Sequence, residues 1–478
     1  MSAEVLWLLV SVVHLSITFT VAVSSDYCLA EDTEPYLYFS TKTAYEITQQ
    51  KYEPEQEVLP RGIQDIPDCT PVGIWMLMRH GTRYPHVDEI KRFRELINIR
   101  DQIIVNNRER GHGKLCGEDV VALKGWTFNV TEDEADDLTW QGEVDLRQIA
   151  KRMKGHFREL LDATYTDSRF TIHYTNVDVT KNSAKAFTKE LFGRPIEMTD
   201  NLVDPMLTPQ GNCTSWIEGF SSSNEDEKEE TLFRNSNYMR QTIHEVSERL
   251  GFKYDLSFDA IYDIYDLCRY EKAWYYKSVS PWCAAFTHFH LKVLEYYEDL
   301  SYYYGSGYGK PDTARLGCPL VQDLIYKIDN ITKNGTSDVP PITFYFVEEL
   351  ALKAVLTRLG IAKDSTPLKH NNFNPTTSTK RQWRTSIICP FAGNLAVVLY
   401  LCQGANYKVM FYLNEQFIDY AGCHVGLCDW TYIMDSFSEL VNPTECNLDF
   451  CYEPSFAITS LASLWLLILT TCAVLLTQ

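Results

Sequence analysis

Two arginines flank a histidine in residues 79–85, which read Arg-His-Gly-Thr-Arg-Tyr-Pro. Arg79 and Arg83 can offer forked N–H donors to the oxygens of one phosphate group. Once these donors neutralise the phosphate charge, His80 can attack phosphorus as a nucleophile. An isolated Arg-His pair usually belongs to an ordinary surface, but the full seven-residue string after an apolar run predicts a site of phosphoryl transfer.

The apolar run before this string, residues 72–78, is short and is bounded by Pro71 and Gly81. It therefore predicts a buried strand of an α/β sheet rather than a helix. The motif then lies at the carboxyl end of the strand, where ligands bind in open α/β sheets. Further strands are expected at residues 170–174, 342–346, 395–401 and 409–413, and helices at 89–104, from 138, from 183 and up to 360.

The length and composition of the chain predict a large protein of enzyme size that binds a small-molecule ligand. With 478 residues, 45% of them hydrophobic, the chain exceeds one ordinary domain. Residues 200–314 are acidic and aromatic and predict a mainly helical insertion, or cap, within an α/β domain formed by residues 25–199 and 315–450. The net charge of −20 argues against a nucleic-acid partner, but a local basic cluster can still bind a small polyanion.

The amino-terminal end predicts entry into the secretory pathway. Residues 5–23 are almost free of charge and end in small residues, which is typical of a signal peptide covering residues 1–24. Four Asn-x-Thr glycosylation sequons, at Asn129, Asn212, Asn330 and Asn334, and 14 cysteines agree with secretion and with disulfides. No Cys-x-x-Cys pair predicts a zinc site, whereas Cys423 and Cys428 are close enough to bridge locally.

The carboxyl-terminal end is a hydrophobic tail. Residues 456–476 contain no charged residue, glycine or proline, and no basic flank follows them as it would follow a spanning helix. Residues 456–478 therefore predict a glycosylphosphatidylinositol attachment signal and a lipid-anchored protein of the cell surface, or a secreted one. Attachment of the lipid at Ser455 leaves no spacer before the hydrophobic tail. Attachment near Asn447 leaves a spacer and removes Cys451 and Cys472 from the mature chain, so that an even number of cysteines, 12, remains.

Several further motifs resemble, in order and spacing, the inositol polyphosphate phosphatases of the histidine acid phosphatase family. The resemblance covers nearly the whole mature chain. The matching segments are Thr41-Lys42-Thr43-x-Tyr45, residues 79–85, Leu138-Thr139-x-x-Gly142, Ser183-Ala184-x-Ala186-Phe187, Trp282-Cys283, residues 294–296 and 307–309, and residues 390–395.

This resemblance implies the histidine phosphatase fold, a central sheet flanked by helices with a helical cap, and hydrolysis of inositol polyphosphates such as phytate. His80 would form a phosphohistidine while Arg79 and Arg83 hold the phosphate oxygens, and Lys42 would approach substrate phosphates. Because the guanidinium groups take the place of a cation, neither a metal nor another cofactor is expected.

The chain departs from the family pattern in two places. Val179 stands where the family has a third phosphate-binding arginine, and Lys181 can replace part of that charge only as a point charge. After the strand at 342–346, the family has a histidine and an acidic proton donor, whereas this chain has Glu348 and Glu349. Either glutamate can take either position, and both can instead simply begin the next helix.

Two functions of different classes follow. The first is a phosphomonoesterase acting on inositol polyphosphates or related esters, which the intact motif at residues 79–83 favours. The second is a surface pseudophosphatase that keeps the fold and binds anions with poor turnover, which Val179 and the missing histidine favour. A phosphoglycerate mutase-like activity uses the same nucleophile chemistry and is the third alternative. The oligomeric state is not predicted.

Overall fold

The computed structural model describes most of the chain between residues 28 and 452. Residues 1–24 and 456–478, predicted to be the signal peptide and the attachment signal, lie outside the described residues. The described ranges are 28–29, 34–50, 65–198, 205–208, 211, 213–216, 228–335, 338–423, 425–442 and 444–452.

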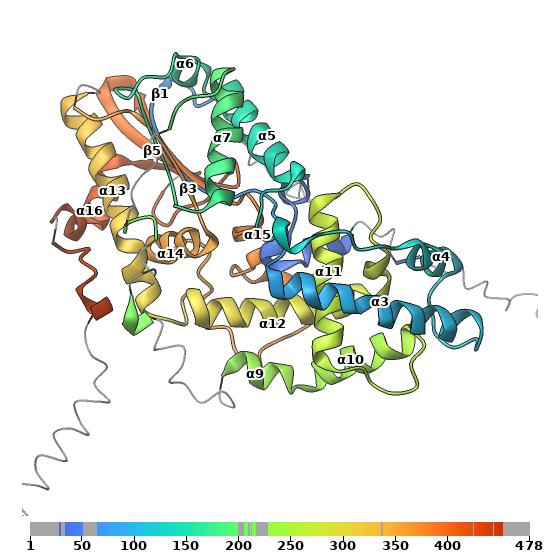
Figure 1. Ribbon diagram of the computed structural model, residues 1–478. Helices are drawn as coiled ribbons and strands as arrows, with labels where there is room; N and C mark the ends of the chain where they lie inside the picture. Colours follow the sequence, from blue (N-terminus) through green and yellow to red (C-terminus); the bar gives the residue numbers. More distant parts are fainter. Residues whose placement is uncertain are drawn as a thin grey trace, which may run out of the picture.

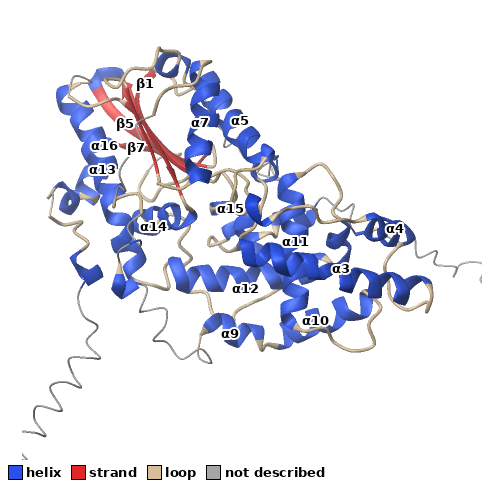
Figure 2. Cartoon of the chain, viewed as in Figure 1, coloured by secondary structure: helices blue, strands red, loops and turns tan. Residues whose placement is uncertain are grey.

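A mixed sheet with the strand order β2-β3-β1-β4-β5-β6 lies at the centre of one half of the molecule, and β7 pairs with β5 (Figure 2). The strands β2, β3 and β1 are parallel, whereas β4 runs antiparallel to β1. The five predicted strands are confirmed, while the short β6 and β7 were not predicted. The strands are β1 (Cys69–Arg79), β2 (Phe170–Tyr174), β3 (Ile342–Val347), β4 (Asn394–Cys402), β5 (Asn406–Leu413), β6 (Gln416–Phe417) and β7 (Leu427–Asp429).

Strand β1 is buried on both faces because helices cover both sides of the sheet (Figure 1). Ile74 and Met76 belong to the core that includes residues of α5 and α7, whereas Trp75 and Leu77 belong to the core that includes residues of α13 and α14. This two-sided burial explains why residues 72–78 form a continuous apolar run. The helices are α5 (Trp140–His156), α7 (Asp178–Phe192), α13 (Asp312–Asn334) and α14 (Glu349–Leu359).

A second group of helices lies beyond the carboxyl ends of β1 and β3 (Figure 1). Helix α3 confirms the helix predicted at residues 89–104, and it packs against α11 with Phe93 and Tyr270 in ring contact. Helix α12 contacts α9 and α10. The boundaries of the helical insertion, expected at residues 200–314, stay a prediction. These helices are α3 (Val87–Arg108), α4 (Gly117–Gly125), α9 (Glu229–Arg234), α10 (Asn237–Arg249), α11 (Phe258–Trp274) and α12 (His288–Ser306).

Short helices complete the described part of the chain. They are α2 (Tyr45–Gln50), α6 (Arg158–Leu161), α15 (Thr385–Ile388) and α16 (Trp430–Ser436). Among the described residues, no helix combines the length and the apolar character that crossing a membrane requires.

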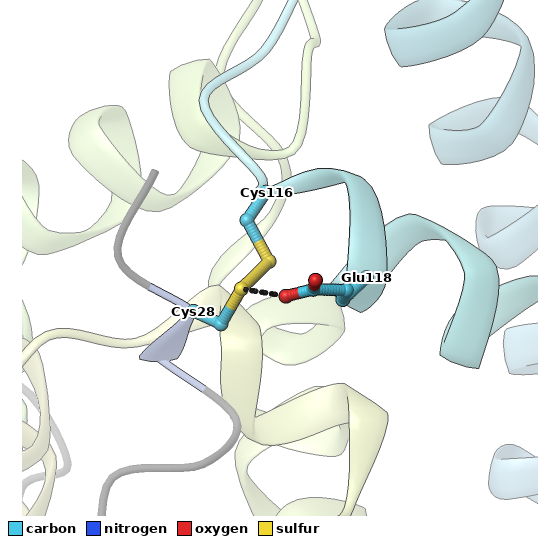
Figure 3. Close-up of side chains that lie close together, drawn as sticks. All are labelled: Cys28, Cys116 and Glu118. Atoms are coloured by element: carbon cyan, nitrogen blue, oxygen red, sulfur yellow. Dashed lines mark hydrogen bonds between the residues drawn. A yellow bond between two sulfur atoms is a disulfide. The ribbon is translucent and has the colours of Figure 1, made fainter. Parts of the chain in front are cut away.

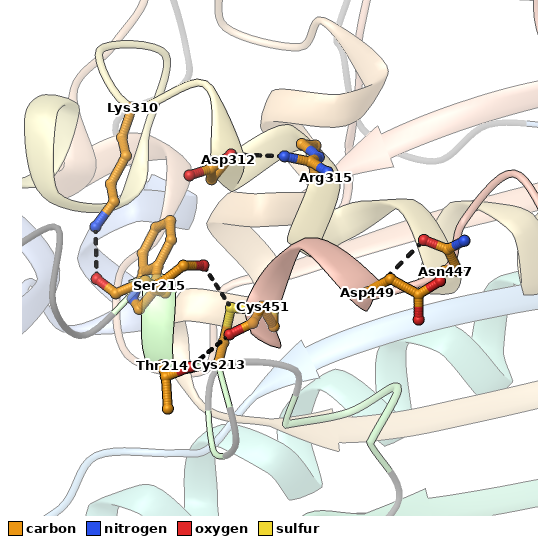
Figure 4. The surroundings of a disulfide bond; sticks show 10 residues. Cys213, Thr214, Ser215, Lys310, Asp312, Arg315, Asn447, Asp449 and Cys451 are labelled. Atoms are coloured by element: carbon orange, nitrogen blue, oxygen red, sulfur yellow. Dashed lines mark hydrogen bonds and ion pairs between the residues drawn. A yellow bond between two sulfur atoms is a disulfide. The ribbon is translucent and has the colours of Figure 1, made fainter. Parts of the chain in front are cut away.

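Six disulfides join described cysteines, in agreement with the predicted secretory compartment. The local Cys423–Cys428 bridge is confirmed. The parity argument for attachment near Asn447 is wrong, because Cys451 pairs with Cys213 (Figure 4). Among the cysteines that the structure describes, the buried Cys389 is the unpaired one. The Thr214 hydroxyl also donates to the Cys451 carbonyl (2.6 Å), so the chain up to Cys451 is held on the folded protein.

Candidate active site

The motif at residues 79–83 lies where two parallel strands end. Arg79 is the last residue of β1 and pairs in register with Val347, the last residue of β3. The next residue, His80, donates its backbone N–H to Val347 O (3.0 Å) and accepts from Ala392 N (2.9 Å). The predicted position of the motif, at the carboxyl end of a buried strand, is confirmed.

The His80 side chain is oriented as a nucleophile requires. It is 4% exposed, and its Nδ1 lies 2.8 Å from Gly81 O. Because a carbonyl only accepts, Nδ1 carries the proton and Nε2 keeps its lone pair. Burial, followed by the charges of Arg79 and Arg83, holds the pKa of His80 well below its usual range. The lowered pKa favours the neutral imidazole, whose Nε2 lone pair could attack a phosphorus atom.

Arg79 is fixed beside His80 by contacts on both ends of its guanidinium group. Nη1 donates to Thr41 O (2.5 Å) and Cys389 O (3.0 Å), and the group lies over the Phe391 ring. Nη2 pairs with Glu349 Oε2 at 3.2 Å. Among the described residues, Arg79 Nε has no hydrogen-bond partner although it is buried. These contacts hold the guanidinium group in one orientation.

Arg83 lies nearer the surface than Arg79. Nη1 donates to Tyr84 O (2.7 Å) and to Asp136 Oδ1 (2.9 Å), and Nη2 lies 3.0 Å from His86 Nε2. The Trp274 indole donates to Arg83 O (3.1 Å), which ties helix α11 to the motif. The structure thus brings Arg79, His80 and Arg83 together, as the spacing of the motif predicted.

Close packing of two glycines shapes the loop that follows His80. A Cβ on Gly81 would lie 2.5 Å from Gly142 O, and a Cβ on Gly142 would lie 2.2 Å from Thr82 O. The Thr139 hydroxyl caps α5 through Gly142 N and also donates to Thr82 O (2.8 Å). The Leu138-Thr139-x-x-Gly142 segment therefore supports the loop: Thr139 binds the loop backbone, and Gly142 lets that backbone approach helix α5 closely.

Ser183, from helix α7, supports the same loop. Its hydroxyl accepts from Gly81 N (3.1 Å) and donates to Val179 O (2.7 Å). Val179 is buried in the first turn of α7, so the position of the absent third arginine lies close to the motif. Lys181 lies in the same turn and is half-buried, and its role in binding stays a prediction.

Lys42 is already paired with protein carboxylates. Its Nζ lies 2.9 Å from Glu89 Oε1 and 2.5 Å from Asp266 Oδ1, and it sits over the Tyr270 ring. Burial alone would lower the pKa of Lys42, but the charge of Asp266 and its other anionic neighbours raise it. Contact between Lys42 and a substrate phosphate would have to compete with these ion pairs, so this role also stays a prediction.

The two adjacent glutamates, Glu348 and Glu349, have different surroundings in the structure. Glu349, the first residue of α14, pairs with Arg79 and with Lys353 Nζ at 3.1 Å. Burial would raise the pKa of Glu349, but Lys353 and Arg79 outweigh it and hold the pKa at about 2. In Glu348, burial and the neighbouring Glu349 charge raise the pKa. The low pKa favours the ionised form of Glu349, whereas the raised pKa makes Glu348 the better of the two at holding a proton.

Some residues of this site were missed in the sequence. Lys353 lies four residues after Glu349 on α14, and this helical spacing was a signal that could have identified the pair. Asp145 is buried and accepts from Thr82 N and its hydroxyl, and burial raises the pKa of Asp145 to about 6. His86 and Asp136 had no sequence signal, because they meet only through the tertiary fold.

One group of potential metal ligands occurs in the described part of the chain, away from this motif: Cys28, Cys116 and Glu118 (Figure 3). The two sulfurs form a disulfide, and Glu118 Oε2 lies 3.0 Å from Cys28 Sγ. A disulfide offers no thiolate, so this group does not have the chemistry of a metal site.

Comparisons with known proteins match both the sequence and the fold. The family model of the histidine phosphatase superfamily (branch 2) matches residues 73–414. Multiple inositol polyphosphate phosphatase 1 of Drosophila melanogaster is 36% identical over 89% of this chain and 90% of its own length. The protein of the same name from Homo sapiens is 27% identical over 80% of this chain and 82% of its own.

Solved structures share the fold at low sequence identity. The phytase from D. castellii superposes with a TM-score of 0.67 and 17% identity, over 86% of this chain and 87% of its own. The multiple inositol polyphosphate phosphatase of Bifidobacterium longum in complex with phosphate superposes with a TM-score of 0.61 and 14% identity, over 82% of this chain and 96% of its own.

Proposed function

Because this chain belongs to the histidine phosphatase superfamily (branch 2), we propose that it hydrolyses phosphate monoesters, inositol polyphosphates among them, through a phosphohistidine on His80. The observation that carries this proposal is the His80 imidazole, which is buried beside Arg79 and Arg83, has a lowered pKa and is oriented by the hydrogen bond from Nδ1 to Gly81 O. Nucleophile and charge-neutralising groups are therefore assembled before substrate arrives.

The reaction has two steps. In the first, His80 Nε2 forms a bond to phosphorus while the P–O ester bond breaks, and Arg79 and Arg83 stabilise the charge on the phosphate oxygens. The leaving oxygen takes a proton from Glu348. In the second, water attacks phosphorus, the Glu348 carboxylate takes the water proton, and the P–N bond breaks to release phosphate and neutral His80.

A direct assay tests this proposal. We would measure phosphate release from inositol hexakisphosphate by a secreted form ending at Ser455, between about pH 4 and pH 8. Release well above that of a His80→Ala variant is the expected result. Absence of release by a folded protein, with a simple phosphate ester also untouched, would contradict the proposal.

The assignment of Glu348 as proton donor gives a sharper prediction. Glu348→Gln should lower kcat/KM for inositol hexakisphosphate by about 100-fold or more, because the poor alkoxide leaving group needs a proton. It should lower kcat/KM for p-nitrophenyl phosphate much less, because that parameter reports the first step and this leaving group needs no proton. Because Glu348 must be protonated and its pKa is raised, kcat/KM for the inositol substrate should fall as the pH rises through that pKa.

Glu349→Gln is the matched control. Glu349 is ionised at all working pH values, so its replacement should produce no dependence on the leaving group. It should instead tighten inhibition by inorganic phosphate, because it removes an anion that occupies Arg79 Nη2. Equal losses of kcat/KM for both substrates in Glu348→Gln, or a leaving-group effect in Glu349→Gln, would contradict the assignment of Glu348 as the acid.

A second candidate function is anion binding without turnover. The ion pair between Glu349 and Arg79 favours this candidate, because a substrate phosphate must share Arg79 with Glu349 or displace it. Calorimetric binding of inositol hexakisphosphate without phosphate release would support this candidate in place of the first.

We also propose that the protein is a glycosylated product of the secretory pathway that reaches the cell surface on a lipid anchor. The disulfides and the sequons support the compartment, and the hydrophobic tail at residues 456–478 supports the anchor. Since the Cys213–Cys451 disulfide requires Cys451, attachment is proposed after Cys451.

Phosphatidylinositol-specific lipase should release the mature protein from intact cells, because the lipid would be the only membrane anchor of the protein. The released fraction is measured by blotting, with detergent extraction as the reference. Release by detergent alone would contradict the anchor.

A further inference from the structure

A cavity with aromatic walls lies beside the catalytic motif and has no part in the proposed reaction. Its volume of about 380 Å³ is within the range of small-molecule sites. The ring of Trp274 lies 5.5 Å from that of Tyr84, and its indole donates to Arg83 O, so the cavity borders the motif. Five aromatic side chains line it: Tyr84, Trp126, Phe128, Trp274 and Tyr275.

The cavity combines apolar surface with a carboxylate. Glu271 of α11 lines it, and the two oxygens of Glu271 accept from the Trp126 indole (2.6 Å) and the Ser280 hydroxyl (2.5 Å). A carboxylate has further acceptor positions, which a ligand can use. At the rim, Tyr275 and Val279 are 62% and 49% exposed. Aromatic faces with a few polar groups suit a sugar, whose C–H surface packs on rings while its N–H and O–H groups donate.

The wall of this cavity also contains a glycosylation sequon. Asn129, the first residue of Asn129-Val130-Thr131, lines the cavity and is exposed. Arg100 and Arg94 of α3 donate to Trp126 O (2.8 Å) and Val130 O (3.2 Å), one on each side of Asn129. Because the backbone is held at both points, a sugar linked to Asn129 Nδ2 would start at the cavity wall.

We propose that Asn129 carries an N-linked glycan whose first N-acetylglucosamine lies in this cavity, on the aromatic rings and beside Glu271. In the attachment, Asn129 Nδ2 loses a proton and forms a bond to C1 of the sugar, while the bond from C1 to a lipid-linked diphosphate donor breaks. Since the sugar is tethered, few contacts are needed to hold it. The inference rests on the proposed passage through the secretory pathway and is independent of turnover.

The first test is removal of the glycan from the native secreted protein by peptide N-glycosidase, which cleaves at the first sugar. Mass spectrometry of glycopeptides measures the rate at Asn129 and at Asn334, an exposed sequon residue that ends helix α13. Release at Asn129 should be about tenfold slower or more, because the sugar must first leave the cavity. Equal rates, or an unmodified Asn129 beside a modified Asn334, would overturn this inference alone. Absence of glycan from both would overturn the secretory proposal as well.

Tyr275→Ala and Tyr254→Ala form a matched pair, because both tyrosines are 62% exposed and only the first lines this cavity. Tyr275→Ala should accelerate release at Asn129 by about fivefold or more, since it removes a ring that packs on the sugar. Tyr254→Ala should leave the rate unchanged. Equal acceleration by the two variants, or none by Tyr275→Ala, would contradict a sugar in the cavity.

Thermal unfolding provides a readout that does not depend on access of the glycosidase. Tyr275→Ala should lower the Tm of the glycosylated protein by about 2–4 °C and have little effect in an Asn129→Gln background, where its partner is absent. The same loss in both backgrounds would show that Tyr275 stabilises the fold without the sugar and would overturn the inference.

Discussion

Replacing His80 with alanine is expected to reduce phosphate release from inositol hexakisphosphate by about a thousandfold or more, to the background of the assay. Alanine cannot form the P–N bond. Cys389 lies nearby, but burial raises the pKa of its thiol to about 11 and keeps it protonated. Steady-state phosphate release measures the loss.

Chemical trapping decides whether the loss reflects a missing nucleophile. Acid-labile, base-stable label from a phosphorylated substrate should appear on the wild type and on His156→Ala, and should be absent from His80→Ala. Equal melting temperatures of the three proteins would exclude unfolding as the cause. Substantial turnover or labelling of His80→Ala would contradict a phosphohistidine at this residue.

Replacing Gly142 with alanine is expected to destabilise the protein by about 3 kcal/mol and to lower kcat by about 100-fold. The added Cβ would lie 2.2 Å from Thr82 O and 2.5 Å from Leu138 Cδ1. Since the first of these is a backbone atom, helix α5 or the loop after His80 must move. That loop carries Arg83, so stability and catalysis should fall together. Calorimetric melting and steady-state kinetics measure the two effects.

Gly155→Ala provides the comparison within the same helix. A Cβ on Gly155 meets no atom within 4 Å, so alanine should stabilise α5 by up to about 1 kcal/mol through its higher helix propensity. Similar melting temperatures for Gly142→Ala and Gly155→Ala would show that the loop accommodates the side chain and that the close approach is unimportant.

The strands and the motif were predictable because their signals are local. An apolar run of strand length predicted β1, and its two-sided burial is what made the run continuous. The positions of β6 and β7 were not predicted, because strands of two and three residues carry too little periodicity. The disulfide partners of Cys213 and Cys318 lie 238 and 128 residues away, and cysteine spacing alone cannot specify such pairs.

The residue types and spacing of Arg79, His80 and Arg83 were sufficient to predict a phosphate site at a strand end, because adjacent residues after a strand necessarily share one edge of the sheet. The distinct roles of Glu348 and Glu349 depended on the tertiary structure. The neighbouring Arg79 and Lys353 lower the pKa of Glu349, while burial raises the pKa of Glu348.

Contacts between distant segments likewise decided the surroundings of Lys42, which pairs with carboxylates 47 and 224 residues away. The pairing of His86 with Asp136 also required the folded loop, since a pKa or an ion pair depends on distance through space and not on separation along the chain.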